Sequence, residues 1–187
     1  PWSEAGAQRL IHEIARGLVL EGFSVVSGAG TGVFHHVVNG VLDALARQNT
    51  REISERLLLR PFPLNITNEE QRKRRWKEYR EQILEEAGIA VFLFGNKQGS
   101  DGGVVLADGM EEEFQIAVQQ GHAVVPVGCT GHMAKSLHER VSADQDRFFP
   151  RRGYKDRLLA LSKKGTPNEV AAQVVAMVKK LRDEPVS

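Results

Sequence analysis

Cysteine is almost absent from this chain of 187 residues, with Cys129 as its single example. One cysteine cannot form an internal disulfide, and it cannot build a zinc site from cysteines alone. An excess of either charge is also missing, because 25 basic residues face 24 acidic ones, which disfavours nucleic acid and anionic membranes as partners. No apolar run reaches the roughly 18–20 residues of a membrane span, and no signal peptide is recognisable. We expect a cytoplasmic protein that binds neither membrane nor nucleic acid.

Short apolar runs alternate with segments of helical spacing along the chain. The runs cover 23–27, 57–59, 89–94 and 123–127, and the predicted helices cover 7–18, 33–45, 69–87, 108–120 and 168–181. This alternation predicts a single α/β domain with a doubly wound parallel sheet and helices on both faces. A ligand would bind at the carboxyl ends of the strands. Residues 142–166 have no clear assignment. Because an α/β domain beginning on a helix lacks its first strand, we expect the chain to be part of a longer polypeptide.

A glycine-rich turn, Gly28, Gly30 and Gly32, joins the first predicted strand to the second helix. Glycine lets backbone amides approach an anion, and the following helix adds its positive end, so the turn predicts a phosphate site. The spacing differs from a dinucleotide fingerprint, and no lysine follows as in a P-loop. The alternative is a tight turn without a ligand.

The helix predicted at 69–87 places Arg80 inside an apolar stripe that also contains Trp76, Tyr79, Ile83 and Leu84. A buried guanidinium is costly unless it is paired, so Arg80 requires a carboxylate or a phosphate. The basic run at 72–77 is interpreted as a solvated helix face, with attraction of a polyanion as the alternative.

Two strand ends carry basic residues near the predicted crevice. Arg60 follows the strand at 57–59, and Lys97 follows the turn formed by Gly95 and Asn96. Each could bind a phosphate; the alternatives are an edge salt bridge for Arg60 and a solvated loop position for Lys97.

The segment "ADGMEEEF" at 107–114 opens a helix. Asp108 and Glu111 have the spacing of a capping box. Glu112 or Glu113 could accept a hydrogen bond from ribose or pair with Arg80.

The stretches "VVSGAGTGVFHHVVNGVLDAL", "RPFP", "YREQILEEAGIAVFLFGN", "GMEEEF" and "AVVPVGCTG" together resemble the SLOG (STALD-type) domains of ThsA-type Thoeris anti-phage effectors, over roughly residues 5–135. The resemblance implies a Rossmann-like sensor domain, not an enzyme, that follows a sirtuin-like NAD hydrolase. Its ligand would be a cyclic ADP-ribose isomer made by a partner TIR-domain protein, and binding would rearrange a homo-oligomer, a dimer or tetramer.

The resemblance also implies roles for residues. The positions matched by Arg80, Lys97 and Glu112 hold the cyclic nucleotide, the glycine turn faces phosphate, and the domain begins with a strand that this sequence lacks. The fused effector could be sirtuin-like or a TIR domain. The expected ligand-binding set is Gly28, Gly30, Gly32, Arg60, Tyr79, Arg80, Gly95, Asn96, Lys97, Gly109, Met110, Glu112 and Glu113. We expect no catalytic residue, no metal and no cofactor.

Two other functions fit some of these residues. A lonely-guy-like nucleotide phosphoribohydrolase would use Glu112 or Glu113 as acid/base and Arg80 as phosphate clamp. That family has a "PGGxGTxxE" loop, whereas "LADGMEEEF" lacks its glycine pair and threonine. A nucleic-acid module would use the basic run at 71–77, but the near-zero net charge and lack of interleaved aromatic residues disfavour it.

Overall fold

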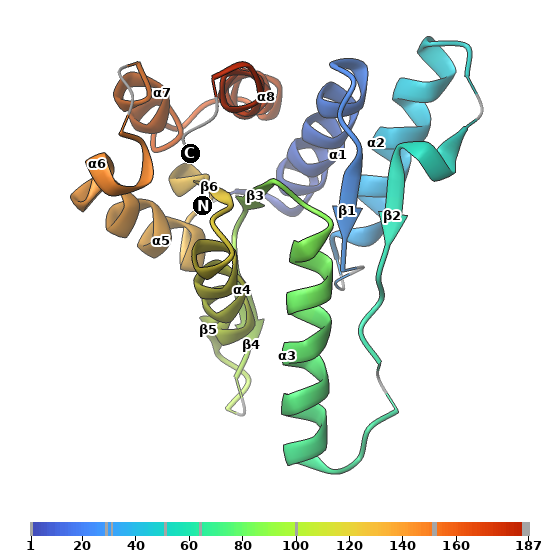
Figure 1. Ribbon diagram of the computed structural model, residues 1–187, viewed down its shortest axis with the longest axis vertical. Helices are drawn as coiled ribbons and strands as arrows, with labels where there is room; N and C mark the ends of the chain where they lie inside the picture. Colours follow the sequence, from blue (N-terminus) through green and yellow to red (C-terminus); the bar gives the residue numbers. More distant parts are fainter. Residues whose placement is uncertain are drawn as a thin grey trace.

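The computed structural model describes residues 2–28, 30, 32–50, 52–63, 65–99, 101–150 and 153–184, in which helices alternate with short strands (Figure 1). The helices are α1 (Glu4–Leu20), α2 (Phe34–Arg47), α3 (Glu69–Glu85), α4 (Asp108–Gln119), α5 (His132–Ala143), α6 (Gln145–Phe148), α7 (Lys155–Ala160) and α8 (Pro167–Asp183). The strands are β1 (Val25–Ser27), β2 (Leu57–Leu59), β3 (Ile89–Phe92), β4 (Asn96–Gln98), β5 (Val104–Leu106) and β6 (Ala123–Pro126). The predicted α/β class is confirmed.

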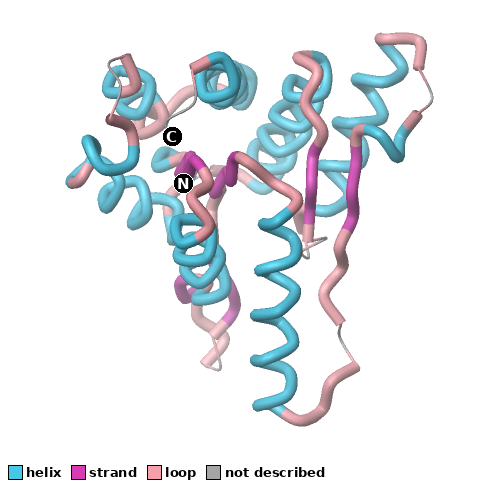
Figure 2. The backbone as a smooth tube through the Cα atoms, in the orientation of Figure 1, coloured by secondary structure: helices cyan, strands magenta, loops and turns pink. Residues whose placement is uncertain are grey.

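The four strands anticipated from the sequence pair in parallel, two by two. β1 pairs with β2, with Val25 opposite Leu57, and β3 pairs with β6, with Ile89 opposite Ala123. Among the described residues no ladder joins β1 to β3, so the two pairs form separate sheets (Figure 2). β4 and β5 form an antiparallel hairpin that the sequence did not predict, because Asn96 was assigned to a turn.

Helix α1 links the two halves of the core. Leu10 and Ile14 belong to the larger cluster, which surrounds β3 and β6, while Ile11, Ala15 and Val19 belong to the smaller cluster beside β1, β2 and α2. These residues recur at helical spacing, so they form two adjacent apolar stripes. Helix α1 therefore packs against both strand pairs.

The unassigned segment at 142–166 is part of the core. It contains α6 and α7 and buries Phe149, Tyr154, Leu158 and Leu161. The Tyr154 ring stacks on Phe149 with centroids 5.3 Å apart, and its hydroxyl donates a hydrogen bond to the backbone oxygen of Glu184, 2.5 Å away. The segment has short helices separated by turns, which hide the periodicity on which sequence assignment depends.

The capping box predicted at Asp108 and Glu111 is wrong. Helix α4 begins at Asp108 itself, with Ala107 at the N-cap and no side-chain cap. Glu111 instead accepts two hydrogen bonds from Arg140 of α5, at 2.7 and 3.0 Å. A bidentate guanidinium is a stronger partner than one backbone amide. Arg140 holds the pKa of Glu111 below its usual value.

Across the described part of the chain, no helix combines the length and apolar character needed to cross a bilayer. The described residues also contain no group of three or more His, Cys, Asp or Glu side chains placed to hold a metal ion.

Candidate functional site

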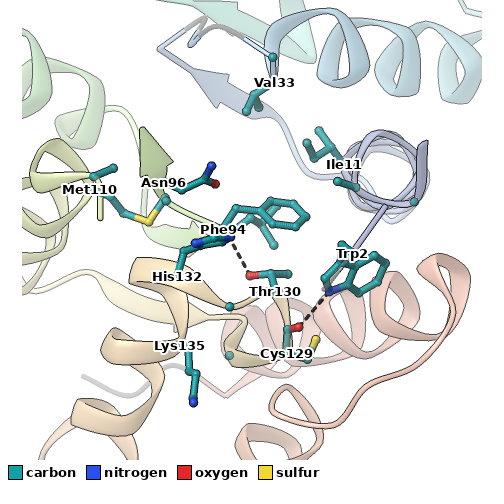
Figure 3. A pocket seen from close by; sticks show the side chains of 18 of the residues that line it. Trp2, Ile11, Val33, Phe94, Asn96, Met110, Cys129, Thr130, His132 and Lys135 are labelled. Atoms are coloured by element: carbon teal, nitrogen blue, oxygen red, sulfur yellow. Dashed lines mark hydrogen bonds between the residues drawn. The ribbon is translucent and has the colours of Figure 1, made fainter. Parts of the chain in front are cut away.

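A pocket of about 1250 Å³ opens at the carboxyl ends of β1, β3 and β6 (Figure 3). Val33 comes from the loop after β1, Phe94 and Asn96 follow β3, and Thr130 and His132 follow β6. Loops that follow parallel strands meet at one edge, which is where open α/β domains bind ligands. The pocket therefore lies where the sequence predicted the crevice.

The wall of the pocket is held by specific contacts around Phe94. Its backbone N–H donates to Thr130 Oγ1 at 2.8 Å, and its ring meets Trp2 edge-on with centroids 6.3 Å apart. Trp2 Nε1 donates to the backbone oxygen of Cys129 at 2.9 Å (Figure 3). Phe94 and His132 have φ values of 57° and 51°, in the left-handed region that side chains rarely adopt. Such strain is often stored at binding sites.

Sequence reasoning did not select Trp2, Phe94, Thr130 or His132 as site residues. The strand-end rule could have found the last three, because they follow β3 and β6. Trp2 carries no comparable signal, since its place depends on the packing of α1.

Arg80 is buried at the edge of this pocket, with 9% of its surface exposed. Its Nη1 donates to Glu112 Oε2 at 2.7 Å, and its Nε lies 3.4 Å from Glu113 Oε1. The guanidinium also lies 5.3 Å from the Phe62 ring centroid and 5.9 Å from that of Trp76. The prediction that Arg80 is buried and needs an anionic partner is confirmed, and that partner is a carboxylate pair from α4.

Glu113 lies in a partly desolvated environment beside Arg80. Desolvation raises the pKa of Glu113, Arg80 opposes that rise, and the neighbouring Glu112 carboxylate adds to it. Its side chain is still 37% exposed, so the desolvation is partial. The contact with Arg80 is an ion pair and not a directed hydrogen bond, since the buried Nε finds no hydrogen-bond partner among the described residues. Because Glu113 lines the pocket, the ion-pair cluster of Arg80, Glu112 and Glu113 reaches the pocket wall.

Lys97 forms a second ion pair next to the pocket. Its Nζ lies 2.5 Å from Asp108 Oδ1, which also accepts a hydrogen bond from the Gly109 amide. Lys97 holds the pKa of Asp108 below its usual value. Both side chains are largely in solvent, and the neighbouring Asn96 and Gly109 line the pocket.

The three glycines of the turn differ in their structural surroundings. A Cβ at Gly28 would lie 2.8 Å from the Phe62 ring, so glycine there permits close packing of Phe62, which lies between β2 and α3. Gly32 has φ +82° and lines the pocket. The Gly30 oxygen accepts hydrogen bonds from Val33 and Phe34 at the start of α2, and a Cβ there would meet nothing within 4 Å. The intervening residues 29 and 31 lie outside the described residues.

The structure divides the expected ligand-binding set into three groups. Those that line the pocket are Gly32, Gly95, Asn96, Gly109, Met110 and Glu113. Three others lie beside it without lining it: Arg80 pairs with the lining residue Glu113 and with Glu112, and Lys97 pairs with Asp108, next to the lining residue Gly109. Gly28, Gly30, Arg60 and Tyr79 are not among the lining residues. Arg60 lies 3.6 Å from Glu86 and so forms the edge salt bridge that was the alternative to phosphate binding. Tyr79 packs against Phe62.

The basic run on α3 is paired locally. Lys73 lies 2.8 Å from Glu69, and Arg75 lies 3.1 Å from Glu78, all on the same helix. These side chains are largely exposed, in keeping with the interpretation of a solvated helix face.

Comparison with known proteins finds several that are similar in sequence to this chain. Three are proteins named NAD(+) hydrolase ThsA. The one from Cytobacillus dafuensis is 45% identical over 76% of this chain and 29% of its own length. That from Bacillus cereus is 39% identical over 80% of this chain and 30% of its own length. That from Enterococcus faecium is 35% identical over 97% of this chain and 37% of its own length. The chain therefore spans about a third of these relatives.

A profile of the Sir2- and TIR-associating SLOG family, STALD, matches residues 1–181. Nearly the whole chain is covered, including all strands, the pocket and the Arg80 cluster. The chain belongs to the Sir2- and TIR-associating SLOG family.

Proposed function

We propose that this chain is the sensor domain of an NAD-hydrolysing anti-phage effector and that it binds a cyclic ADP-ribose isomer. The relatives carry the name NAD(+) hydrolase and are about three times as long, and the family name links these domains to Sir2 and TIR partners. The signal would come from a TIR-domain protein in the cytoplasm. The fused effector would be sirtuin-like or a TIR domain.

The observation that carries the proposal is the buried Arg80 held by Glu112 and Glu113 at the edge of a large pocket. Cyclic ADP-ribose isomers have two phosphates and two riboses. A planar guanidinium suits phosphate oxygens, and carboxylates accept hydrogen bonds from ribose hydroxyls. Lys97 adds a point charge on the neighbouring hairpin. Arg80 is paired with Glu112 and Glu113, so a ligand's phosphate would replace one of these carboxylates.

Signalling requires a second arrangement of the protein. Ligand binding shifts an equilibrium only when the ligand fits one arrangement better than the other. A symmetric homo-oligomer, a dimer or tetramer, would supply two such arrangements of its subunits. The domain would act as a receptor, and NAD hydrolysis would belong to the fused effector.

The second candidate is a lonely-guy-like phosphoribohydrolase, and Glu113 is the observation that favours it. A pocket-lining carboxyl with a raised pKa beside an arginine has the character of a general acid next to a phosphate clamp. Such an enzyme would release adenine from AMP. A receptor would leave every nucleotide intact.

Calorimetric titration with cyclic ADP-ribose isomers, ADP-ribose, NAD and AMP tests the two candidates. We expect one cyclic isomer to bind tightly and to remain unchanged on incubation. Binding should be lost in Arg80→Ala and Lys97→Ala. It should be retained in the controls Arg75→Ala and Lys77→Ala, which remove exposed charges of the same kind from α3. No binding of any cyclic isomer, together with adenine release from AMP, would favour the phosphoribohydrolase.

A further inference from the structure

The hairpin of β4 and β5 lies outside the apolar core. In Figure 1 it extends away from β3 and β6, and none of its strand residues belongs to either core cluster. A two-stranded hairpin is marginally stable in water by itself, and it becomes stable when it gains a third strand or packs against a helix. Among the described residues no third strand pairs with it. An additional strand would therefore stabilise this hairpin.

Strand β5 is apolar on both of its faces. Val104, Val105 and Leu106 expose 67%, 40% and 46% of their surface. In the part of the chain that the structure describes, they are the only consecutive large apolar side chains that are exposed. Strand β4 is polar throughout, at Asn96–Gln98. Natural edge strands are usually protected by charged side chains or proline, and β5 has neither. The edge of β5 is therefore the one open to pairing.

The backbone of β5 directs the peptide groups of Val104 and Leu106 away from β4. Two hydrogen bonds at the ends of the ladder fix this arrangement: Gly99 N–H to the Gly103 oxygen and Ala107 N–H to the Gly95 oxygen. In an antiparallel ladder, hydrogen-bonded pairs alternate with pairs that are not hydrogen-bonded. By this alternation Val105, which lies opposite Lys97, directs its peptide groups to β4. Its two neighbours direct theirs to the free edge.

A second copy of β5 fits this edge. Antiparallel pairing about a twofold axis at Val105 would place Val104 opposite Leu106 of the other copy. These are the residues with outward peptide groups, so each such pair would exchange both of its hydrogen bonds. Val105 would lie opposite its counterpart, in a pair whose side chains approach closely. The strand is thus complementary to itself in both backbone and side chains.

Polarity and charge also favour a second copy. The apolar side chains of the two β5 strands would form the centre, and β4 of each copy would place polar side chains at the rim, as in other protein interfaces. The Lys97 side chains of the two copies would be three strand spacings apart, roughly 14 Å. This separation exceeds the Debye length of about 8 Å in physiological salt. Each Lys97 is also paired with Asp108 of its own copy, so the two cations would repel one another little.

We propose that β5 pairs with β5 of a second copy of this chain and that the two hairpins form one continuous antiparallel sheet about a twofold axis. The pairing would supply an interface for the homo-oligomer of the proposed function, but it rests on the hairpin alone and requires no bound nucleotide. Val104–Leu106 of each copy form a small interface compared with the roughly 1,200–2,000 Å² of stable complexes. We therefore expect a reversible dimer that forms as protein concentration rises.

Charge substitutions at Val105 test the proposal. Val105→Glu would place two carboxylates opposite each other across the twofold axis, which opposes pairing. Within each copy the same carboxylate would face Lys97, so the hairpin itself would keep a favourable pair. Val105→Lys repeats the repulsion with the opposite sign, and a mixture of the two variants would place opposite charges across the axis. Leu42→Glu is the matched control, because Leu42 is also 40% exposed but lies on α2.

Sedimentation velocity from about 5 to about 500 µM, without nucleotide, spans the dissociation constants of a small interface. We expect wild type and Leu42→Glu to dimerise as concentration rises. The dissociation constant should increase at least about tenfold in each Val105 variant, and the mixture of the two variants should recover dimers. Amide hydrogen exchange, read by NMR, should become slower at Val104 and Leu106 as the wild-type concentration rises. The Val105 amide, which is directed to β4, should change little.

Three outcomes would overturn the proposal. One is a wild-type chain that stays monomeric over this range, and another is a dimer that persists in both Val105 variants. The third is a mixture of the two variants that remains monomeric. A monomer that binds a cyclic ADP-ribose isomer would overturn the interface alone, because the calorimetric titration measures nucleotide binding independently.

Discussion

Arg80 Nη1 and Glu112 Oε2 are 2.7 Å apart, although the two residues are separated by 32 positions in the sequence. The bond joins α3 to α4 and holds a buried cation at the edge of the pocket. Removing one member of such a pair leaves the other without its partner, which costs more than the pair itself contributes. The relationship thus bears on both stability and ligand binding.

A double-mutant cycle on Arg80→Ala and Glu112→Ala measures this pair. We expect a coupling energy of about 1 kcal/mol in urea unfolding, because the guanidinium is buried while Glu112 is 39% exposed. Arg75 and Glu78 form the control pair, since both are exposed on α3 and lie 3.1 Å apart. Their coupling should not exceed about 0.5 kcal/mol. Equal coupling in the two cycles would contradict a special role for Arg80.

Asp108→Asn should strengthen binding of an anionic nucleotide. Asp108 is paired with Lys97, and the amide of the variant would leave the Lys97 charge free for phosphate. The expected gain is up to about fivefold in affinity, since an exposed ion pair contributes roughly 0.2–1 kcal/mol. Titration calorimetry of wild type, Asp108→Asn and the exposed control Asp156→Asn would measure it. Weaker binding by Asp108→Asn would show that the carboxylate contacts the ligand directly.

Glu113→Gln should flatten part of the dependence of stability on pH. The raised pKa of Glu113 means that the folded protein holds this proton at pH values where the unfolded chain has lost it. Stability from this group is therefore present below the usual glutamate pKa and declines as pH rises through the folded value. Asp108 and Glu111, whose pKa values are lowered, act in the opposite direction at lower pH.

Urea unfolding of wild type and Glu113→Gln from about pH 4.5 upward isolates the Glu113 contribution. The difference in unfolding free energy should change with pH in favour of the variant as pH rises. A difference that stays constant over this range would mean that Glu113 titrates alike in both states.

Gly28→Ala and Gly30→Ala separate the packing and binding roles of the glycine turn. At Gly28 the new methyl group would collide with Phe62, so we expect a loss of about 1–3 kcal/mol in stability. At Gly30 the methyl group meets open space, so stability should hardly change. If a phosphate approaches this turn, Gly30→Ala should still weaken nucleotide binding measurably. Thermal unfolding of both variants measures the change in stability, and calorimetric titration measures the change in nucleotide affinity. Unchanged affinity in Gly30→Ala would remove Gly30 from the site.

The periodicity of the chain was enough to predict the parallel strands. Residues 57–59 and 89–94 were expected as strands, and the structure has β2 at Leu57–Leu59 and β3 at Ile89–Phe92. The hairpin of β4 and β5 was missed, because all six of its residues are exposed and lack an alternating pattern of buried positions. A hairpin of this kind depends on cross-strand pairing, which local sequence does not reveal.

The sequence by itself determined the α/β alternation, the strand-end position of the pocket and the burial of Arg80. These features follow from local spacing: one apolar stripe on a helix defines which residues face the core. Only the tertiary structure decided that Glu112 and Glu113 both contact Arg80, that Glu111 binds Arg140, and that β1 and β3 remain unpaired with each other. The physical reason is that the partner of a charge or a strand edge depends on the distance between elements, and helix packing sets that distance.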